Sequence, residues 1–316
     1  MTGVQTCALP ISYEPERSIV LLYAYGHTLS FTPGFPQGVL DYREVVEIGE
    51  TVYRNGEILL SDDAASAIKA LLAPRTTGRQ RIAAIIIDPG HGGKDPGAIH
   101  THTIDGKPIP VAEKDVVLGV SLIIFQELKR LFPDKEIILT RSTDTYLTLE
   151  ERTEIANGVS HGPNEAMIFV SVHANASLNP KTNGFEIWYL PPEYRRELLD
   201  SDSMDASAKD LIPILNTMLE EEITVESIIL AKAISGGLAE SLGDQSVNRG
   251  LKEESWFVVR KAKMPSVLVE VGFVTNSEEA ALLTRPVYLQ KIAKGIYNGV
   301  VSFVESFEKT SGFTEQ

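Results

Sequence analysis

Two histidines and two glutamates in this sequence are of the types that carry out metal-assisted hydrolysis. His91 lies in DPGHGGKDPGA, His173 in VSVHANAS and Glu270 in LVEVGFVTN, while Glu113 opens an amphipathic stretch between the first two. Two imidazoles and one carboxylate form a ligand set that holds catalytic zinc and leaves one position open. His91, Glu113 and His173 therefore predict a zinc site, and Glu270 remains as a base for proton transfer.

Three of these residues stand near the ends of apolar, β-branched runs, which are typical of buried strands. The runs cover residues 83–87, 167–172 and 266–271. Ligands bind at the carboxyl ends of the strands in open α/β sheets. We therefore expect His91, His173 and Glu270 to converge, although they are far apart in the sequence.

Each residue taken alone also has a structural interpretation. A histidine after a strand can be an ordinary loop residue, and Glu113 can be an acid favoured by the helix dipole. Glu270 is harder to explain in this way, because an unpaired carboxylate in an apolar run is costly to bury. The remaining histidines (27, 100, 102 and 161) lack strand context and are expected to be solvated, with His100 and His102 near enough to contact a substrate.

Several motifs in one order carry a resemblance to a known family. They are IDPGHGGKDPGA, AEKDVVL, LTRSTDTYLTLEERTEIAN, FVSVHANAS, GFEIWYL, NRGLK, FVVR and PSVLVEVGFVTNSEEAALL, within residues 83–305. In these motifs the chain resembles the zinc-dependent N-acetylmuramoyl-L-alanine amidases (Amidase_3), which cleave bacterial peptidoglycan. The resemblance implies that His91, Glu113 and His173 bind one Zn²⁺ and that Glu270 is the catalytic acid and base.

The same resemblance implies the substrate bond, the amide between the lactyl group of N-acetylmuramic acid and L-alanine. Asn175 and Asp88 are expected to orient the zinc ligands, although both could simply cap loops. Arg260, at the end of the SWFVVR run, could pair with a substrate carboxylate or form a surface ion pair.

The composition excludes two classes of protein. A net charge of −14 argues against a nucleic-acid binder, whose surface would be basic. We find no run of about 18 apolar residues, so no membrane span is expected.

The amino-terminal region divides into three expected parts. Residues 1–12 back-translate to a sequencing adapter, so we interpret them, with the single cysteine Cys7, as foreign to the protein. Residues 13–73 are expected to be a truncated accessory region, with a hairpin around Asn55-Gly56 and a helix capped by Ser61. Residues 74–81 are the expected linker.

The catalytic domain is expected at residues 82–308, followed by a polar tail at 309–316. Strands and helices alternate in it, which predicts a three-layer α/β/α sandwich with a mostly parallel twisted sheet, preceded by a truncated small α+β remnant. The expected strands are 83–88, 136–141, 166–173, 184–190, 256–260 and 266–271, and the expected helices are 113–131, 149–158, 225–242 and 286–307.

Residues 191–223 form an acidic insertion with expected helices at 192–199 and 211–222. Some relatives in the resembled family carry here a helix that covers the zinc until an activator protein moves it. By this resemblance, carboxylates could reach the metal, and the candidates are Glu193, Glu197, Glu220, Glu221 and Glu222. The alternative interpretation, which we favour slightly, is a solvated acidic surface excursion.

Two other functions remain open at this stage: a zinc carboxypeptidase acting on stem peptides, and a wall-binding regulator without turnover. The inferred peptidoglycan substrate implies a location in the periplasm or cell wall.

Overall fold

The computed structural model describes residues 11–14, 19–24, 27–42, 44–54, 57–72, 81–162, 164–194, 196, 198 and 212–310. The chain divides into two compact units. One comprises residues 1–78, 197–220 and 314–316, and the other comprises residues 79–196 and 221–313. The expected limits of the adapter, accessory region, linker and catalytic domain stay predictions. Cys7 and most of the expected linker lie outside the described residues.

The first unit contains a five-stranded antiparallel sheet in the order β1-β2-β3-β4-β5. These strands are β1 (Ile11–Glu14), β2 (Ile19–Ala24), β3 (His27–Phe31), β4 (Gln37–Leu40) and β5 (Glu44–Glu47). The expected hairpin is present as β6 (Thr51–Arg54) and β7 (Glu57–Leu60), and α1 (Asp62–Leu71) follows. Ser61 caps α1 by accepting from the Ala64 N–H at 3.1 Å, as predicted. Ile11 and Ser12, assigned to the adapter, belong to β1 and pair with β2.

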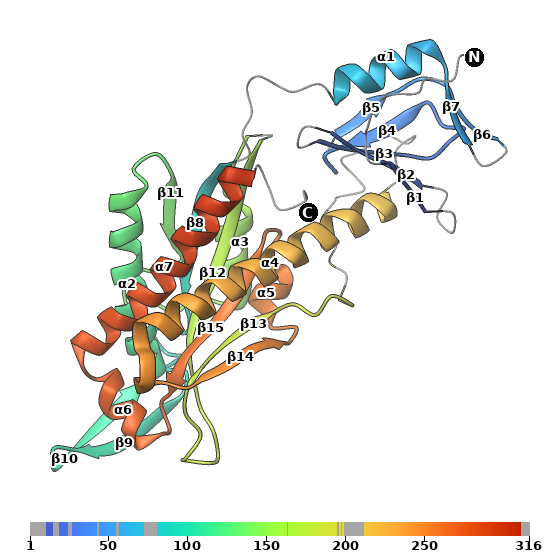
Figure 1. The fold of residues 1–316 in the computed structure, drawn as a ribbon. Helices are drawn as coiled ribbons and strands as arrows, with labels where there is room; N and C mark the ends of the chain where they lie inside the picture. Colours follow the sequence, from blue (N-terminus) through green and yellow to red (C-terminus); the bar gives the residue numbers. More distant parts are fainter. Residues whose placement is uncertain are drawn as a thin grey trace. The chain divides into compact units, whose positions relative to one another are not determined.

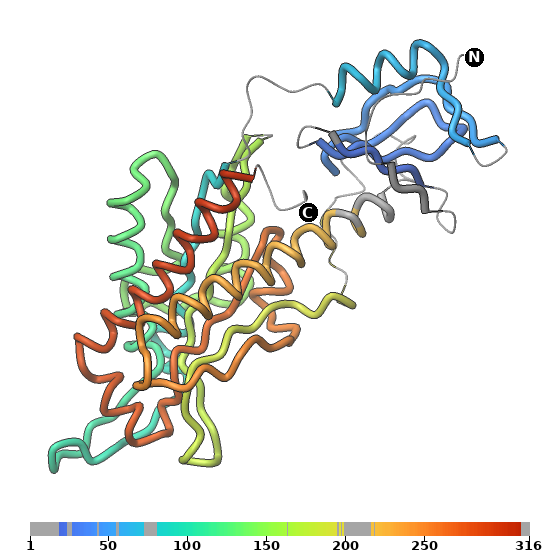
Figure 2. Tube along the Cα trace, viewed as in Figure 1, coloured from blue at the N-terminus to red at the C-terminus, as the bar shows by residue number. Residues whose placement is uncertain are grey.

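The second unit is built on a six-stranded sheet in the order β11-β8-β12-β15-β13-β14. The strands are β8 (Arg81–Pro89), β11 (Glu136–Leu139), β12 (Glu165–Asn175), β13 (Phe185–Tyr189), β14 (Asn248–Glu253) and β15 (Ser266–Phe273). The first four strands in this order run parallel, while β13 lies antiparallel to β15 and parallel to β14. The mostly parallel sheet confirms the prediction, and Figure 2 shows its central strands side by side despite their separation in sequence.

Helices cover both faces of this sheet (Figure 1). The helices are α2 (Glu113–Leu131), α3 (Leu149–Asn157), α4 (Ile212–Leu242), α5 (Phe257–Lys261), α6 (Ser277–Leu283) and α7 (Pro286–Thr310). Residues of α2, α4, α6 and α7 share one apolar cluster with the sheet, and residues of α3 and α5 share the other. The three-layer sandwich is therefore confirmed.

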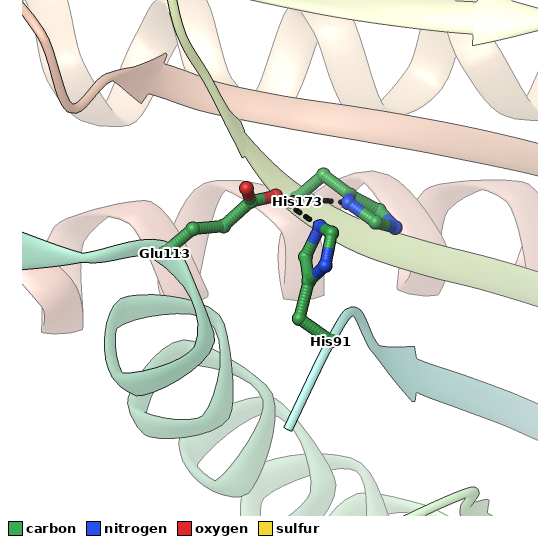
Figure 3. A group of neighbouring side chains, drawn as sticks. All are labelled: His91, Glu113 and His173. Carbon is green, nitrogen blue, oxygen red and sulfur yellow. Dashed lines mark hydrogen bonds and ion pairs between the residues drawn. The ribbon is translucent and has the colours of Figure 1, made fainter. Parts of the chain in front are cut away.

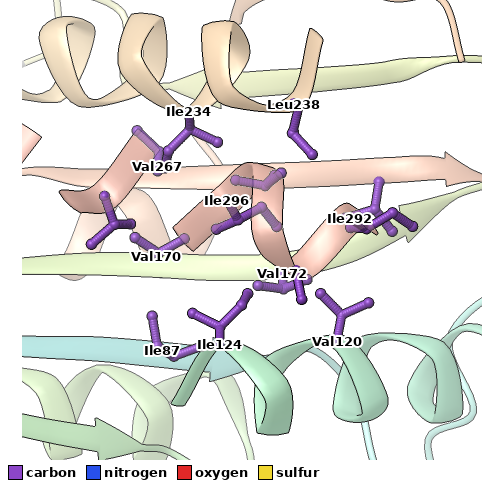
Figure 4. Packing of buried hydrophobic residues seen from close by; sticks show 14 of the residues in the cluster. Ile87, Val120, Ile124, Val170, Val172, Ile234, Leu238, Val267, Ile292 and Ile296 are labelled. Atoms are coloured by element: carbon purple, nitrogen blue, oxygen red, sulfur yellow. The ribbon is translucent and has the colours of Figure 1, made fainter. Parts of the chain in front are cut away.

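The larger cluster fixes α2 and hence the direction of Glu113. Val120 and Ile124 of α2 pack on Ile87, Val170 and Val172 of the sheet (Figure 4). Across the same face, α4 and α7 approach so closely that a Cβ at Gly299 would lie 2.7 Å from the carbonyl oxygen of Ala233. Glycine is required there because the two backbones are almost in contact.

The prediction of a strand at 256–260 is wrong, because this segment is the short helix α5. Its run of valines suggested a strand, but Val258 and Val259 are buried against the sheet from a single helical turn. Tertiary packing has overridden their local preference. The prediction for α2 matched its bounds, whereas the helix expected at 225–242 begins earlier, at Ile212.

Two elements near the site were not predicted. β9 (Ile99–Ile104) and β10 (Lys107–Ala112) form a hairpin that leads into α2. His102 on β9 is buried, and its Nε2 lies 2.8 Å from the carbonyl oxygen of Val274. The expectation that His102 is solvated is therefore wrong.

A candidate metal and hydrolysis site

The loop after β8 holds His91 in an unusual backbone conformation. His91 has φ of 57°, a left-handed value that is uncommon outside glycine. Arg152 of α3 donates to the His91 carbonyl at 2.6 Å and to the Pro89 carbonyl at 2.7 Å, and Arg141 donates to the Gly90 carbonyl at 2.6 Å. Two guanidinium groups therefore fix three successive carbonyls, so the conformation of His91 is determined by its surroundings.

Asp88 acts on this loop through Arg152. Its buried carboxylate accepts from Arg152 at 2.8 Å, Thr140 at 2.6 Å and Ser171 at 2.8 Å. No contact between Asp88 and an imidazole is among these bonds. The structure thus places Asp88 beneath the loop, where it orients the guanidinium group that holds His91.

The two ring nitrogens of His91 have different carboxylate partners. Nδ1 lies 2.8 Å from Oδ2 of Asp95, and Nε2 lies 3.1 Å from Oε1 of Glu113. Burial lowers the pKa of His91, but hydrogen bonds and charge attraction from Glu113 and Asp95 outweigh it, and the pKa is raised. Asp95 therefore sets the ring orientation and leaves Nε2 directed into the site.

Glu113, at the start of α2, contacts both the segment before β9 and the end of β12. Its Oε2 accepts from the Ala98 N–H at 2.8 Å, while Oε1 accepts from the Ala174 N–H at 3.0 Å and lies 2.9 Å from His173 Nδ1. Burial opposes ionisation of Glu113, yet the hydrogen bonds and charges of both histidines lower its pKa well below the usual value. Glu113 is thus held as a carboxylate.

Figure 3 shows the three side chains turned toward one another. The imidazoles of His91 and His173 meet edge to face with centroids 5.0 Å apart. One ligand atom from each of His91, Glu113 and His173 lies within 4.8 Å of the other two. A Cβ at Gly90 would overlap the His173 ring, so this approach requires glycine at position 90. The convergence expected from the strand ends is present.

The donor set fits a zinc ion. Zinc binds imidazole nitrogen and carboxylate oxygen, and catalytic sites typically supply three such protein ligands. One nitrogen of His91 is already engaged by a carboxylate, which is the usual arrangement around a zinc-bound histidine. The residues present therefore match zinc in number, type and supporting contacts.

Glu270 lies on β15 in register with His173 on β12. Burial, followed by the charges of Glu113 and Glu186, raises its pKa well above the usual value. Its buried Oε2 has no hydrogen-bond partner among the described residues. A buried carboxyl group in this state is a structural liability, and one that borders a cavity is suited to exchanging a proton with a ligand.

Glu186 on β13 stands directly opposite Glu270. Its carboxylate is only 1% exposed and forms ion pairs with Arg249 and, at 2.8 Å, with Lys252. The pKa of Glu186 is lowered, because these two cations outweigh its burial. Of two neighbouring carboxyl groups, Glu186 is therefore the compensated one.

A cavity of about 490 Å³ opens over these groups, within the range of small-ligand sites. His91, Glu113, His173 and Glu270 all line it. Its other lining residues are Asp95, Ala98, Tyr146, Leu147, Leu149, Arg152, Ala174, Asn175, Ala176, Trp256, Phe257, Val258 and Leu268.

The remaining predicted site residues are placed differently. Asn175 lines the cavity, and its amide lies 3.5 Å from Glu186. Arg260 does not line it, and its guanidinium group lies near the rings of Tyr194 and Phe257. The roles of both in binding stay predictions.

The acidic insertion is described only in part. Residues 192–194 form a turn rather than the expected helix, and the second expected helix is the start of α4. Glu193 is exposed and Glu220 is buried, whereas Glu197 lies outside the described residues. None of the described residues 191–194, 196 and 221–223 lines the cavity. The inhibitory roles proposed for Glu193, Glu197, Glu220, Glu221 and Glu222 stay predictions.

Sequence reasoning missed Asp95, Arg152 and Glu186. Asp95 had a usable signal, because it is a carboxylate four residues after His91 in a glycine-rich loop. Arg152 and Glu186 reach the site from a helix and a strand whose positions depend on the assembled sheet. No local pattern could have revealed them.

Comparison with known proteins identifies similar sequences. The family described as N-acetylmuramoyl-L-alanine amidase matches residues 85–302. The amidase AmiA of Salmonella typhimurium is 31% identical over 257 residues, which cover 77% of this chain and 83% of that protein. The amidase LytC of Bacillus subtilis is 33% identical over 69% of this chain, but only 35% of LytC is covered.

Solved structures agree with the sequence matches. AmiC2 of Nostoc punctiforme is 30% identical, with a TM-score of 0.52 over 70% of this chain and 97% of that structure. The CwlD amidase of Clostridioides difficile, solved in complex with the GerS lipoprotein, is 27% identical, with a TM-score of 0.53 over 71% of this chain and 99% of that structure.

Proposed function

The chain belongs to the N-acetylmuramoyl-L-alanine amidase family, and we propose that His91, Glu113 and His173 bind one zinc ion for its hydrolysis of peptidoglycan. The bond cleaved joins N-acetylmuramic acid to the L-alanine of the stem peptide. The convergence of two imidazoles on one buried carboxylate, beside the unpaired Glu270, is the observation that carries the proposal.

When bound, zinc would act as a Lewis acid that polarises the scissile carbonyl and makes water a better nucleophile near neutral pH. Glu113 and Asp95 orient the imidazoles for this role. Arg152 and Arg141 keep the loop of His91 rigid.

Glu270 is the proposed general base and acid. Its raised pKa makes it a competent proton acceptor near neutral pH, where acid–base catalysis is most effective. It would take a proton from the attacking water and return it to the nitrogen of the departing L-alanine. The C–N bond breaks, a carboxylate forms on the lactyl group, and the stem peptide leaves with a free amine.

Replacement of the ligands tests the metal site. We expect the purified protein to contain one zinc ion per chain, and His91→Ala or His173→Ala to abolish stoichiometric binding, as measured by elemental analysis after dialysis. His161→Ala is the matched control, because His161 is exposed. This variant should keep its zinc. Full zinc occupancy in both ligand variants would refute the assignment.

Product analysis separates this reaction from that of a zinc carboxypeptidase. Digestion of purified peptidoglycan should release intact stem peptides with L-alanine at the amino terminus, identified by mass spectrometry. Shortened stem peptides still attached to glycan would instead indicate a carboxypeptidase. A wall-binding regulator would release neither product.

The substrate also supports a location. Peptidoglycan lies outside the cytoplasmic membrane, so we propose that the protein acts in the periplasm or cell wall. Among the described residues, no helix is long and apolar enough to cross a membrane. Recovery of the native protein in the cytoplasmic fraction alone would count against this location.

An activator protein is a further part of the proposal. The CwlD structure contains the GerS lipoprotein, so at least one similar amidase assembles with a partner. In this chain the acidic insertion at residues 191–223 is the proposed target of such a partner.

A further inference from the structure

The cavity lining includes large apolar side chains that are left exposed. Tyr146 is 37% exposed, Leu149 is 49% exposed and Trp256 is 43% exposed, and all three line the cavity that contains Glu270. Exposed apolar groups that gather around a cavity indicate a ligand-binding surface. We call Tyr146, Leu149 and Trp256 the apolar rim.

The rim is fixed by contacts to the rest of the site. Trp256 lies at the amino-terminal cap of α5 and meets the Trp188 ring edge to face, with centroids 6.0 Å apart and an angle of 85°. Asp144, two residues before Tyr146, accepts from the Gly93 N–H at 2.7 Å and from Lys114 at 2.7 Å. The rim is therefore anchored to the loop that carries His91.

The charged groups that line the cavity disfavour an anionic occupant. The carboxyl groups of Asp95, Glu113 and Glu270 line the cavity, and its one arginine, Arg152, is 2% exposed. Both terminal nitrogens of Arg152 already donate to Asp88 or to loop carbonyls. Among the described lining residues, there is no other arginine and no lysine. The cation that contacts the rim is Lys94, whose Nζ lies over the Tyr146 ring, 4.2 Å from its centroid.

The two parts of the substrate, the stem peptide and the glycan, differ in charge. The stem peptide carries carboxylates, whereas the amino sugars of the glycan present uncharged rings with acetamido methyl groups. A tryptophan offers a flat apolar face together with a polar N–H, a combination suited to ligands that are partly apolar and partly polar.

We propose that the apolar rim is the glycan-binding part of the site, with Trp256 stacking against an amino-sugar ring next to the scissile amide. This inference rests on the proposed function. It assigns the side of the cavity at α3 and α5 to the sugar and directs the acidic stem peptide away from it.

Binding can be measured without hydrolysis. The chain contains two tryptophans, so Trp188→Phe leaves Trp256 as the fluorescent reporter. The zinc-loaded variant is titrated with the peptide-free disaccharide of N-acetylglucosamine and N-acetylmuramic acid whose lactyl carboxyl group is blocked as its methyl amide, and separately with a glycan-free stem tripeptide. We expect a saturable change in Trp256 emission with the disaccharide and none with the tripeptide at equal concentration. No saturable change with the disaccharide, or a change with the tripeptide alone, overturns the inference.

Kinetics on the otherwise unchanged protein provide a second measurement. Trp256→Leu, which keeps an apolar side chain but removes the ring, should raise KM for peptidoglycan by about tenfold and change kcat by less than about twofold. Trp256→Tyr should restore most of the loss. The matched control is Val287→Ala, since Val287 is 66% exposed on α7 and does not line the cavity. An unchanged KM in Trp256→Leu overturns the role of the ring.

The outcomes separate this inference from the proposed function. If the protein hydrolyses peptidoglycan but does not bind the disaccharide, the proposed function stands and the glycan subsite is refuted. A protein that releases no stem peptide loses the proposed function, whatever the fluorescence shows.

Discussion

At the scale of single residues, Glu113 preorganises the site. Its carboxylate lies near both imidazoles and is fixed by two backbone N–H groups, so the ligands face one another before any metal binds. Ligands that are already in place lose less conformational entropy on binding. The glutamate therefore positions the two imidazoles in addition to its proposed role as a ligand.

Asp95 is the residue whose replacement tests this arrangement most directly. Its side chain is 44% exposed, so Asp95→Ala should leave the fold intact while freeing the His91 ring. We expect zinc affinity to fall by about 10–100-fold, as is typical for loss of a carboxylate that orients a ligand. Competition with a chromophoric chelator measures this change. Asp244→Ala, at another exposed aspartate, should bind zinc as the unmodified protein does, and equal affinity in both variants would rule out the role of Asp95.

Glu270→Gln should separate zinc binding from turnover. The variant should keep zinc and lose about 10²–10⁴-fold in peptidoglycan hydrolysis, because only proton transfer is removed. Near-normal hydrolysis would exclude Glu270 from the mechanism.

The same variant has a predictable pH dependence of stability. The pKa of Glu270 in the folded protein is raised above the usual value of 4.5. The contribution of Glu270 to the free energy of unfolding is therefore fully present below pH 4.5 and is lost as the pH rises through the folded pKa. Zinc-free Glu270→Gln should therefore be more stable than the unmodified protein by about 1–3 kcal/mol at about pH 8. The difference should vanish near pH 4 in denaturant titrations. The exposed Glu240→Gln should show no such dependence.

The convergence of His91, Glu113 and His173 could be expected from the sequence because each residue is tied to the end of a strand or the start of a helix. The residues that hold them could not. Arg152 donates to the His91 carbonyl from α3, some sixty positions away in the chain. Only the packed sheet brings these two residues into contact. Supporting contacts of this kind depend on tertiary geometry rather than on local pattern.

At the scale of elements, the crossing of α4 and α7 sets the thickness of one helical layer. Gly237, Gly295 and Gly299 lie where the two helices meet. A side chain at any of these positions would separate the helices from each other and from the sheet beneath them.

Two glycine substitutions test this crossing against helix propensity. Gly299→Ala should destabilise the protein by about 1–3 kcal/mol, because the added Cβ lies against the backbone of α4. Gly236→Ala is the matched control, since Gly236 is exposed on α4 with no atom within 4 Å of an added Cβ. It should stabilise the helix by up to about 1 kcal/mol. Thermal unfolding measures both, and a stabilising Gly299→Ala would contradict the close crossing.

Periodicity predicted the long elements well and the short ones poorly. α2 presents a sustained apolar stripe, and its bounds were predicted correctly. α5 has five residues, too few to show a period, and its valines favoured a strand. In the β9–β10 hairpin, β9 is mostly polar and β10 carries two prolines, so no alternation of apolar residues marks it.

At the scale of the whole molecule, the acidic insertion is the segment whose function is still a hypothesis. If residues 191–223 cover the zinc, deletion of 192–219 with a short Gly/Ser bridge should raise peptidoglycan hydrolysis at least tenfold. That change corresponds to about 1.4 kcal/mol of bias toward the closed state. Activity is measured by release of stem peptides from purified peptidoglycan. Unchanged activity in a folded, zinc-loaded deletion variant would leave the segment as an acidic surface excursion.

The pairing of Glu186 with Arg249 and Lys252 also bears on the register of β13 in the sheet. β13 enters the sheet antiparallel to β15, and a slip by one residue would turn every side chain of β13 to the opposite face. Glu186 would then lie among the apolar residues that now surround Ile187, away from both cations. Such a misaligned strand would bury an uncompensated charge and be rejected during assembly. The ion pairs beside Glu270 thus also favour the correct register of β13.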